Sequence, residues 1–203
     1  MDNNALFKIA YGLFVLTAND GQKDNGCIIN TLSQVTSNPL QVTIAVNKLN
    51  YTHDIIQNTG KFTASVINEA ADFEIFKRFG FQSGKTVDKF QDFKDTIQTV
   101  NGTLAVTLGT NAYISANVVE KFDVGTHTIF LAKVEDAKIL SDIPSATYSY
   151  YQEHIKPKAD KKPVSAKTVW RCKICGYEYE GDELPDDFVC PICKHGKVDF
   201  EKV

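Results

Sequence analysis

The sequence predicts a mainly β protein in two parts: a closed or partly closed β-barrel with short helices, followed by a small unit that folds around a metal ion. Two observations lead to this interpretation. Runs rich in Val, Ile, Thr and aromatic residues recur through the first part of the chain, with few helical patterns between them. Four cysteines then fall in two closely spaced pairs near the end of the 203-residue chain.

The strand candidates of the first part are bounded by turn residues such as Asn19-Asp20-Gly21 and Ser37-Asn38-Pro39. They are residues 12–18, 26–36, 41–46, 61–67, 102–108, 112–122 and 126–140. Two short helices are predicted, over residues 51–58 and 71–79, and the second places Phe73, Phe76 and Phe79 at helical spacing. Many strands with few helices indicate a barrel with appended helices.

Composition excludes several classes of protein. The net charge of −3 gives no nucleic-acid footprint, and no run approaches the roughly 18 apolar residues of a membrane span. The apolar residues 5–18 follow Asp2 rather than a basic region and contain Lys8, so we expect mature structure there and not a signal peptide. We expect a cytoplasmic protein.

A change in composition divides the chain. Residues 152–168 are polar and Lys-rich and contain two prolines, so they predict a flexible linker. Such a basic run can also bind an acidic partner, but a solvated tether is the simpler interpretation. The predicted domains are therefore residues 1–151 and residues 169–203, joined by this linker.

The four cysteines have the spacing of a metal site. Cys172 and Cys175 form one pair, Cys190 and Cys193 the other, and each pair has two intervening residues. Four thiolates so spaced can surround one ion, and a unit of about 35 residues needs such an ion to fold. In a reducing cytosol paired cysteines favour metal over disulfides. Spacing alone fits both iron and zinc.

The residues around the cysteines resemble rubredoxins. Gly176-Tyr177 follow the first pair, Leu184-Pro185-Asp186-Asp187-Phe188 precede the second, and Pro191 lies inside it. The resemblance implies one iron ion and a shortened rubredoxin domain of the kind fused to other redox domains. Lys194 stands where rubredoxins usually have glycine, and the neighbouring His195 is expected to be a surface residue. Structural zinc remains the alternative.

A single thiolate-bound iron constrains its neighbour. It accepts one electron, whereas NADH and NADPH give a hydride, which is two electrons. A flavin converts between the two because it is stable in oxidised, one-electron and two-electron forms. If the C-terminal unit binds iron, a flavin is therefore expected in the first part of the chain.

Four segments then resemble the flavin reductase-like, FMN-binding split-barrel family, which includes flavoredoxins and a ferric reductase. They are residues 7–17, 26–36, 47–53 and 125–130. The resemblance covers roughly residues 1–151 and implies a split β-barrel. The fused arrangement resembles that of the high-molecular-weight rubredoxins of anaerobes.

Three residues supply what a flavin phosphate needs. Lys48, Asn50 and Thr52 give one cation and two short polar groups just before a predicted helix, whose N-terminus favours an anion. They predict the phosphate-binding part of an FMN site. Helix capping and packing are the alternative roles for such residues.

The resemblance implies further contacts to the flavin. His127, in a strand pattern, is expected near the ring or the nicotinamide as the candidate catalytic residue. The other residues expected to contact FMN are Asn30, Thr31, Leu32, Ser33, Asn47, Phe81 and Ser83.

Other patterns support no separate function. Residues 80–86 are one residue short of a P-loop and follow a helical pattern, so nucleoside triphosphate binding is rejected. Cys27 is interpreted as a buried small residue, with a redox thiol as the alternative. No Ser/His/Asp arrangement for hydrolysis stands out in the sequence.

These interpretations predict an oxidoreductase that passes electrons from NAD(P)H through FMN to a four-cysteine iron centre and on to a redox partner. By resemblance that partner is a flavodiiron protein reducing oxygen or nitric oxide, and the chain forms a homodimer. The alternative is a flavin or ferric reductase with a zinc-stapled interaction tail.

Overall fold

The computed structural model describes residues 2–157, 168–192 and 195–203. The chain divides into two compact units, Met1–Pro157 and Lys158–Val203. Residues 158–167 of the predicted linker, the predicted ligand Cys193 and the unusual Lys194 lie outside the described residues. The first residues of that predicted linker belong to the π-helix η2 (Tyr151–Ile155), which crosses the expected domain boundary.

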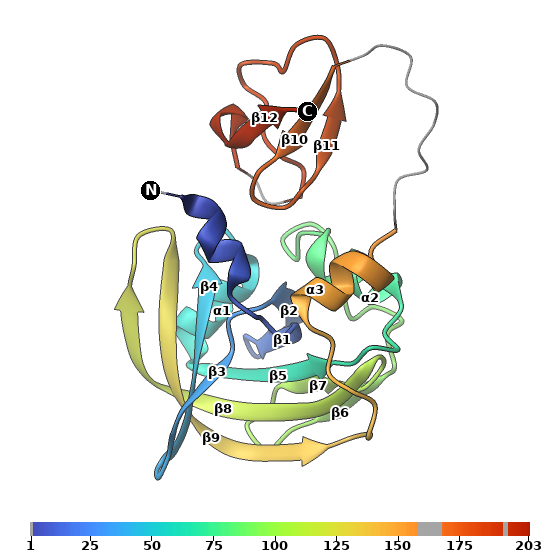
Figure 1. Ribbon diagram of the computed structural model, residues 1–203. Helices are drawn as coiled ribbons and strands as arrows, with labels where there is room; N and C mark the ends of the chain where they lie inside the picture. The colour runs from blue at the N-terminus through green and yellow to red at the C-terminus, as the bar shows by residue number, and fades with distance from the viewer. Residues whose placement is uncertain (1, 158–167, 193–194) are drawn as a thin grey trace. The chain divides into compact units, whose positions relative to one another are not determined.

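The first unit is built on one antiparallel sheet of seven strands, in the order β2-β1-β5-β8-β9-β4-β3. Figure 1 shows the long strands β8 and β9 curving around the unit. The strands are β1 (Phe14–Asn19), β2 (Asp24–Ile29), β3 (Ser33–Ser37), β4 (Leu40–Asn47), β5 (Lys61–Ile67), β8 (Thr110–Asp123) and β9 (His127–Ile139). The mainly β fold class is confirmed.

The concave face of the sheet packs around helix α1 (Tyr51–Thr59). Strand β4 alternates between buried and half-buried residues along most of its length, which is the pattern of a strand with one face in the core. Ile55 and Ile56 of α1 pack against Phe62, Phe130 and the other buried residues of these strands. Gly60 ends the helix with φ 67°, a backbone conformation that favours glycine.

A second core lies on the other side of β1 and β5. Helix α2 (Phe73–Gly80), helix α3 (Tyr148–Tyr150) and η2 contribute to it, and Figure 1 shows α2 and α3 on the same side of the unit. The short 3-10 helix η1 (Asn3–Lys8) precedes β1. The rings of Phe76 and Tyr151 contact each other in a tilted arrangement with centroids 4.4 Å apart, which joins α2 to the end of the unit. No helix in the described part of the chain has the length and apolar character to cross a membrane.

A hairpin of two short strands, β6 (Thr96–Gln98) and β7 (Leu104–Val106), is attached through buried polar groups. Thr63 Oγ1 of β5 lies 2.6 Å from Thr103 Oγ1. Asn101 Nδ2 donates to the backbone oxygens of Phe62 and Ala116, both at 3.1 Å. Because buried polar groups are stable only when they are paired, these bonds fix the hairpin on the sheet.

Two strand predictions need correction. The expected strand over residues 26–36 is two strands, β2 and β3, because the chain leaves the sheet at residues 30–32. The expected strand 102–108 shortens to β7, and its partner β6 was not predicted, since three residues are too few for a readable alternation. The strand over residues 61–67 matches β5 at both ends.

The C-terminal unit has a three-stranded sheet in the order β11-β10-β12. Its elements are β10 (Val169–Cys172), β11 (Glu178–Glu180), the 3-10 helix η3 (Lys197–Asp199) and β12 (Phe200–Lys202). Leu184 and Phe200 are buried, and Phe188 packs edge-on to Phe200 at 5.3 Å. Aromatic side chains thus pack in one cluster with the cysteines of this unit.

Phe79→Ala tests the second core. The Phe79 ring is fully buried, and it lies 5.4 Å from the ring of Phe90 and 5.5 Å from that of Phe93. Truncation leaves a cavity, so the free energy of unfolding should fall by about 3–5 kcal/mol. Urea unfolding measures this loss. Val100→Ala, at a side chain 72% exposed, is the control and should change stability by no more than about 0.5 kcal/mol; equal effects would contradict the packing.

Candidate functional site

Three of the four predicted metal ligands converge in the C-terminal unit. The sulfurs of Cys172, Cys175 and Cys190 lie within 4.8 Å of one another. The sulfurs of Cys175 and Cys190 are 3.4 Å apart. Tetrahedral coordination with metal–sulfur bonds of about 2.3 Å puts ligand sulfurs about 3.8 Å apart, so this spacing fits one metal ion.

Two tight turns place these sulfurs. After Cys172 the backbone folds back, so that the Gly176 amide donates to the Cys172 oxygen and the Cys172 amide donates to the Tyr177 oxygen, both at 2.8 Å. Gly176 has φ 73°, which explains the glycine after the first pair. In the second turn the Cys190 amide donates to the His195 oxygen at 2.8 Å.

The site is shielded unevenly. Cys172 and Cys190 are buried, whereas Cys175 is half-buried. Leu184 and Phe200 complete the apolar cluster around these sulfurs. Ile174, between the first two ligands, is 45% exposed. Water is thus excluded from two ligands, while the third lies near the surface.

In the first unit, the end of β4 and the start of β9 form the second candidate site. Asn47 pairs with His127 in the antiparallel register of these strands. The Lys48 amide donates to the Thr126 oxygen at 3.0 Å, and Thr126 Oγ1 lies 2.9 Å from His127 Nδ1. Two segments that are far apart in the sequence, residues 47–52 and 123–127, are thereby brought together.

Lys48 has a partner that the sequence did not reveal. Its Nζ lies 2.7 Å from both carboxylate oxygens of Asp123, the last residue of β8. The hydrogen bond from Lys48, with a second from the Gly125 amide, lowers the pKa of Asp123. The Asp123 carboxylate is thus the partner of the Lys48 ammonium in this structure, and the contact of Lys48 with a phosphate stays a prediction.

Asn50 and Thr52 begin helix α1. The Asn50 side chain is the N-cap and accepts from the Thr52 amide at 3.0 Å. Thr52 is fully buried, and its Oγ1 accepts from Asn25 Nδ2 at 2.9 Å. Both side chains therefore stabilise the helix start, and their contact with a phosphate stays a prediction.

The four predicted residues from Asn30 to Ser33 lie where β2 ends and β3 begins. Thr31 Oγ1 donates to the Ala45 oxygen at 2.7 Å and accepts from the Ala45 amide at 3.2 Å, so β4 holds this segment. Leu32 packs against the barrel core, and Ser33 is exposed. The break between β2 and β3 thus falls at residues that are predicted to contact the flavin.

Phe81 and Ser83 lie in the loop after α2. Phe81 is 38% exposed, and its ring centroid is 5.6 Å from that of Phe73. The Ser83 oxygen accepts from the amides of Thr86 and Val87, which makes the loop compact. Lys85 Nζ lies 3.8 Å from Asp54 Oδ2, so the loop contacts the first turn of α1.

The sequence interpretation missed a histidine arrangement. His53 Nδ1 lies 3.1 Å from Asp54 Oδ1, and His53 Nε2 lies 2.9 Å from Thr128 Oγ1. The order carboxylate, imidazole, hydroxyl resembles a hydrolytic triad. Thr128 is only 7% exposed, so its hydroxyl is closed to a substrate and the arrangement joins α1 to β9. The sequence did draw attention to this residue, because His53 is the last residue of segment 47–53, which carried part of the family resemblance.

Cys27 is a packing residue in this structure. Its side chain is 3% exposed and belongs to the barrel core. Burial raises the pKa of the Cys27 thiol, which disfavours the reactive thiolate.

Comparison with known proteins bears on both sites. The flavin reductase like domain family matches residues 6–159, and the rubrerythrin, rubredoxin-like domain family matches residues 170–201. A high molecular weight rubredoxin of Moorella thermoacetica is 33% identical over the full length of both chains. A ferric-chelate reductase (NAD(P)H) of Archaeoglobus fulgidus is 36% identical over 85% of this chain and 100% of its own.

A solved structure gives the fold of the first unit. The chain superposes on an NADH:FAD oxidoreductase of Streptomyces globisporus with a TM-score of 0.63 and 24% identity, over 77% of this chain and 92% of the other. At that identity the similarity shows the fold alone.

Metal removal is expected to unfold the C-terminal unit alone. Binding the ion is part of the folding free energy of so small a unit, whereas the first unit has its own two cores. The only tryptophan of the chain, Trp170, lies in β10 and donates to the Gly181 oxygen at 3.1 Å, so it reports on this unit. Its fluorescence should shift to that of exposed tryptophan, with the far-ultraviolet circular dichroism of the barrel kept. An unchanged Trp170 emission in metal-free protein would contradict this.

Proposed function

The chain belongs to the flavin reductase-like family and is an NAD(P)H-dependent oxidoreductase with a rubredoxin-like domain, and we propose that its two units form one electron path. Electrons enter from NAD(P)H at a flavin bound by the first unit. They leave through iron bound by Cys172, Cys175, Cys190 and Cys193, on to a redox partner. The observation that supports this most is the convergence of three thiol sulfurs in a chain that begins with a flavin reductase domain.

The chemistry of the two cofactors explains why they occur in one chain. A nicotinamide gives two electrons as a hydride, and thiolate-bound iron takes one. Bound FMN supplies the conversion between these steps. Each nicotinamide oxidised therefore reduces the iron twice. Between these two reductions the iron must pass its electron to an acceptor.

We propose the following roles for residues of the first unit. Lys48, Asn50 and Thr52 hold the phosphate of FMN. His127 lies beside the nicotinamide or the ring, and its pairing with Asn47 across β4 and β9 supports a shared site. The residues that contact the ring and the ribityl chain are Asn30, Thr31, Leu32, Ser33, Asn47, Phe81 and Ser83.

The acceptor is proposed to be a protein. Glu178 and Asp186 are paired with Arg171 and Lys197, but five acidic side chains of the C-terminal unit are exposed and have no ion pair within the described residues. They are Glu180, Asp182, Glu183, Asp187 and Glu201. These carboxylates favour an acceptor with a basic surface, and family resemblance supports a flavodiiron protein.

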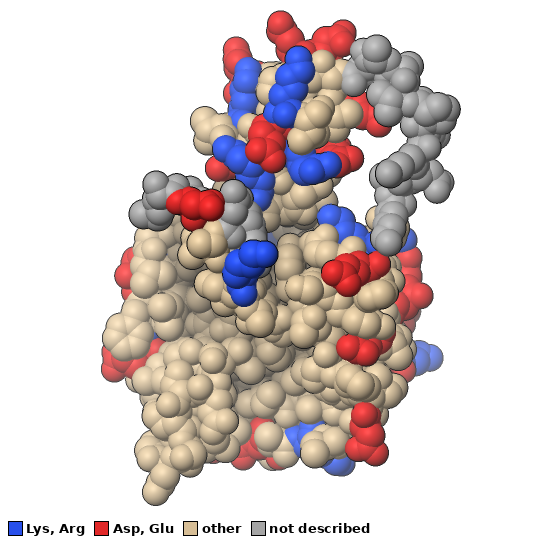
Figure 2. Space-filling view, viewed as in Figure 1, with Lys and Arg blue, Asp and Glu red and all other residues tan. Residues whose placement is uncertain are grey.

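A homodimer is proposed for the first unit. Figure 2 shows a broad surface with few charged side chains, which includes the β3–β4 hairpin. Val35 of β3 is 47% exposed and Leu40 of β4 is 43% exposed. β3 is an edge strand and is exposed along its length, so a second copy would cover groups that otherwise face water.

The similarity to a ferric-chelate reductase favours a second candidate function. In it the first unit reduces a flavin or chelated ferric iron, and the C-terminal unit holds structural zinc for an interaction with a partner. The ligand spacing fits this equally well. Metal analysis of protein from its native source separates the two candidates, since zinc without iron excludes the electron path.

Cys190→Ser tests the path. Replacing a buried ligand should remove the iron while NAD(P)H still reduces the flavin, because the first unit does not contain the ligand. Reduction of a rubredoxin-accepting protein should fall to background. Iron content, flavin absorption and acceptor reduction are measured together.

Cys27→Ala is the matched control, since Cys27 is a buried cysteine of the first unit, and it should keep its iron and its acceptor reduction. If Cys190→Ser still reduces the acceptor at the parent rate, electrons do not leave through the C-terminal unit.

A further inference from the structure

The loop of residues 81–88 is fixed at its base by a buried lysine. Lys89 is 3% exposed, and its Nζ donates to the Gly26 oxygen of β2 at 2.8 Å and to the Phe79 oxygen of α2 at 3.0 Å. Phe79 precedes the loop and Lys89 follows it. The two bonds therefore close the loop at its base and tie that base to β2.

A buried ammonium group is an unusual anchor. Burial lowers the pKa of Lys89, which reflects the cost of removing the charge from water. An apolar side chain would fill the space without that cost. The ammonium gives something that an apolar side chain cannot, namely directed bonds to two carbonyl oxygens from different elements.

The middle of the loop is held by a second set of contacts, from Lys23 just before β2 and from Asn25 within it. Lys23 Nζ donates to the Gly84 oxygen at 3.0 Å and to the Val87 oxygen at 3.3 Å. Asn25 is fully buried, and its Oδ1 has no hydrogen-bond partner within the described residues. A Cβ added to Gly84 would lie 2.0 Å from that oxygen, so only glycine allows the approach.

Asn25 also contacts the start of α1. Its Nδ2 donates to Thr52 Oγ1 at 2.9 Å. One buried amide thus touches Gly84 with its oxygen and the predicted phosphate-binding helix start with its nitrogen. The Lys85–Asp54 ion pair spans the same two elements at the surface.

We propose that Lys89 and Asn25 are positioning residues of the flavin site, which fix Phe81 and Ser83 relative to the first turn of α1. This inference rests on the proposed flavin contacts of Phe81 and Ser83. Two costly features, a buried charge and a buried oxygen without a partner, both act on this one loop. Neither residue is a predicted flavin contact, so each acts through the loop.

The test is a double-mutant cycle on FMN affinity, measured by quenching of flavin fluorescence in the full-length protein. Lys89→Met should weaken FMN binding about tenfold because the loop loses its base. Phe81→Ala should weaken it severalfold. The double variant should bind no more weakly than Lys89→Met alone, since a displaced loop has already lost the Phe81 contact.

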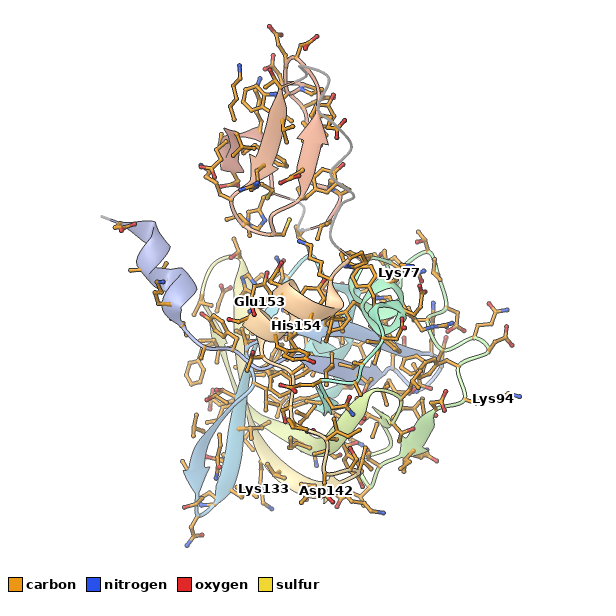
Figure 3. All side chains as sticks on the ribbon, turned by 45° about the vertical axis from the view of Figure 1, so that its right-hand side comes forward. Lys77, Lys94, Lys133, Asp142, Glu153 and His154 are labelled. Atoms are coloured by element: carbon orange, nitrogen blue, oxygen red, sulfur yellow. The ribbon has the colours of Figure 1, made fainter. Side chains whose placement is uncertain are left out.

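Lys94→Met is the control, because Lys94 points away from the first unit (Figure 3), and it should bind FMN within twofold of the parent.

Gly84→Ala gives an independent variant that leaves Lys89 in place. The added methyl meets Asn25 and should displace the loop, with an FMN affinity about tenfold lower. Adding Asn25→Ala removes the oxygen that the methyl meets, so the double variant should recover part of the affinity. If Lys89→Met does not fold, these variants decide the question.

Two results would overturn the proposal. One is FMN affinity within twofold of the parent in folded Lys89→Met and Gly84→Ala. The other is that the losses of FMN binding free energy in Lys89→Met and Phe81→Ala add up in the double variant, which would mean that Lys89 does not act through Phe81. A parent protein that binds no FMN would instead contradict the proposed function itself.

Discussion

The sulfurs of Cys172, Cys175 and Cys190 lie within 4.8 Å of one another, and thiolates at such a distance repel unless a cation lies between them. The fold of the C-terminal unit depends on this interaction, because its core contains only a few buried side chains around the sulfurs. The bound metal therefore stabilises the turns that supply the ligands. When that metal is iron, the unit also gains a redox centre that accepts one electron.

This constraint extends to the first unit. A one-electron centre needs a converter before a nicotinamide can reduce it, and the first unit matches the flavin reductase like domain family. The antiparallel register of β4 and β9 aligns Asn47 with His127, and the turn after β4 leads directly into α1. Strand pairing thus brings together residues of the candidate flavin site that are far apart in the sequence.

Much of this arrangement could be predicted from local patterns. Runs rich in Val, Ile, Thr and aromatic residues between turn residues located most strands, and residue identity around the cysteines indicated a rubredoxin-like unit. The break at residues 30–32 was missed, because no glycine or proline marks a turn there and the break depends on Thr31 bonding to Ala45. A bond to another strand leaves no mark on the local sequence.

The same limit applies to the side chains around the candidate flavin site. Lys48 was expected to bind phosphate, and its pairing with Asp123, 75 residues later, has no local signal. The contact of His53 with Thr128 and the burial of Lys89 also join segments that are far apart in the sequence. Residue type alone can indicate which side chains are able to bind a ligand. Which partners those side chains contact depends on how the chain folds.

Anaerobic titration of the native protein with NADH or NADPH tests the central claim most directly. The absorption bands of the flavin and of the iron–thiolate centre are followed together, without added acceptor. The account predicts that both bands bleach, and that the rate of iron reduction does not depend on protein concentration, since both centres belong to one assembly. A flavin that becomes fully reduced while the iron stays oxidised would contradict it.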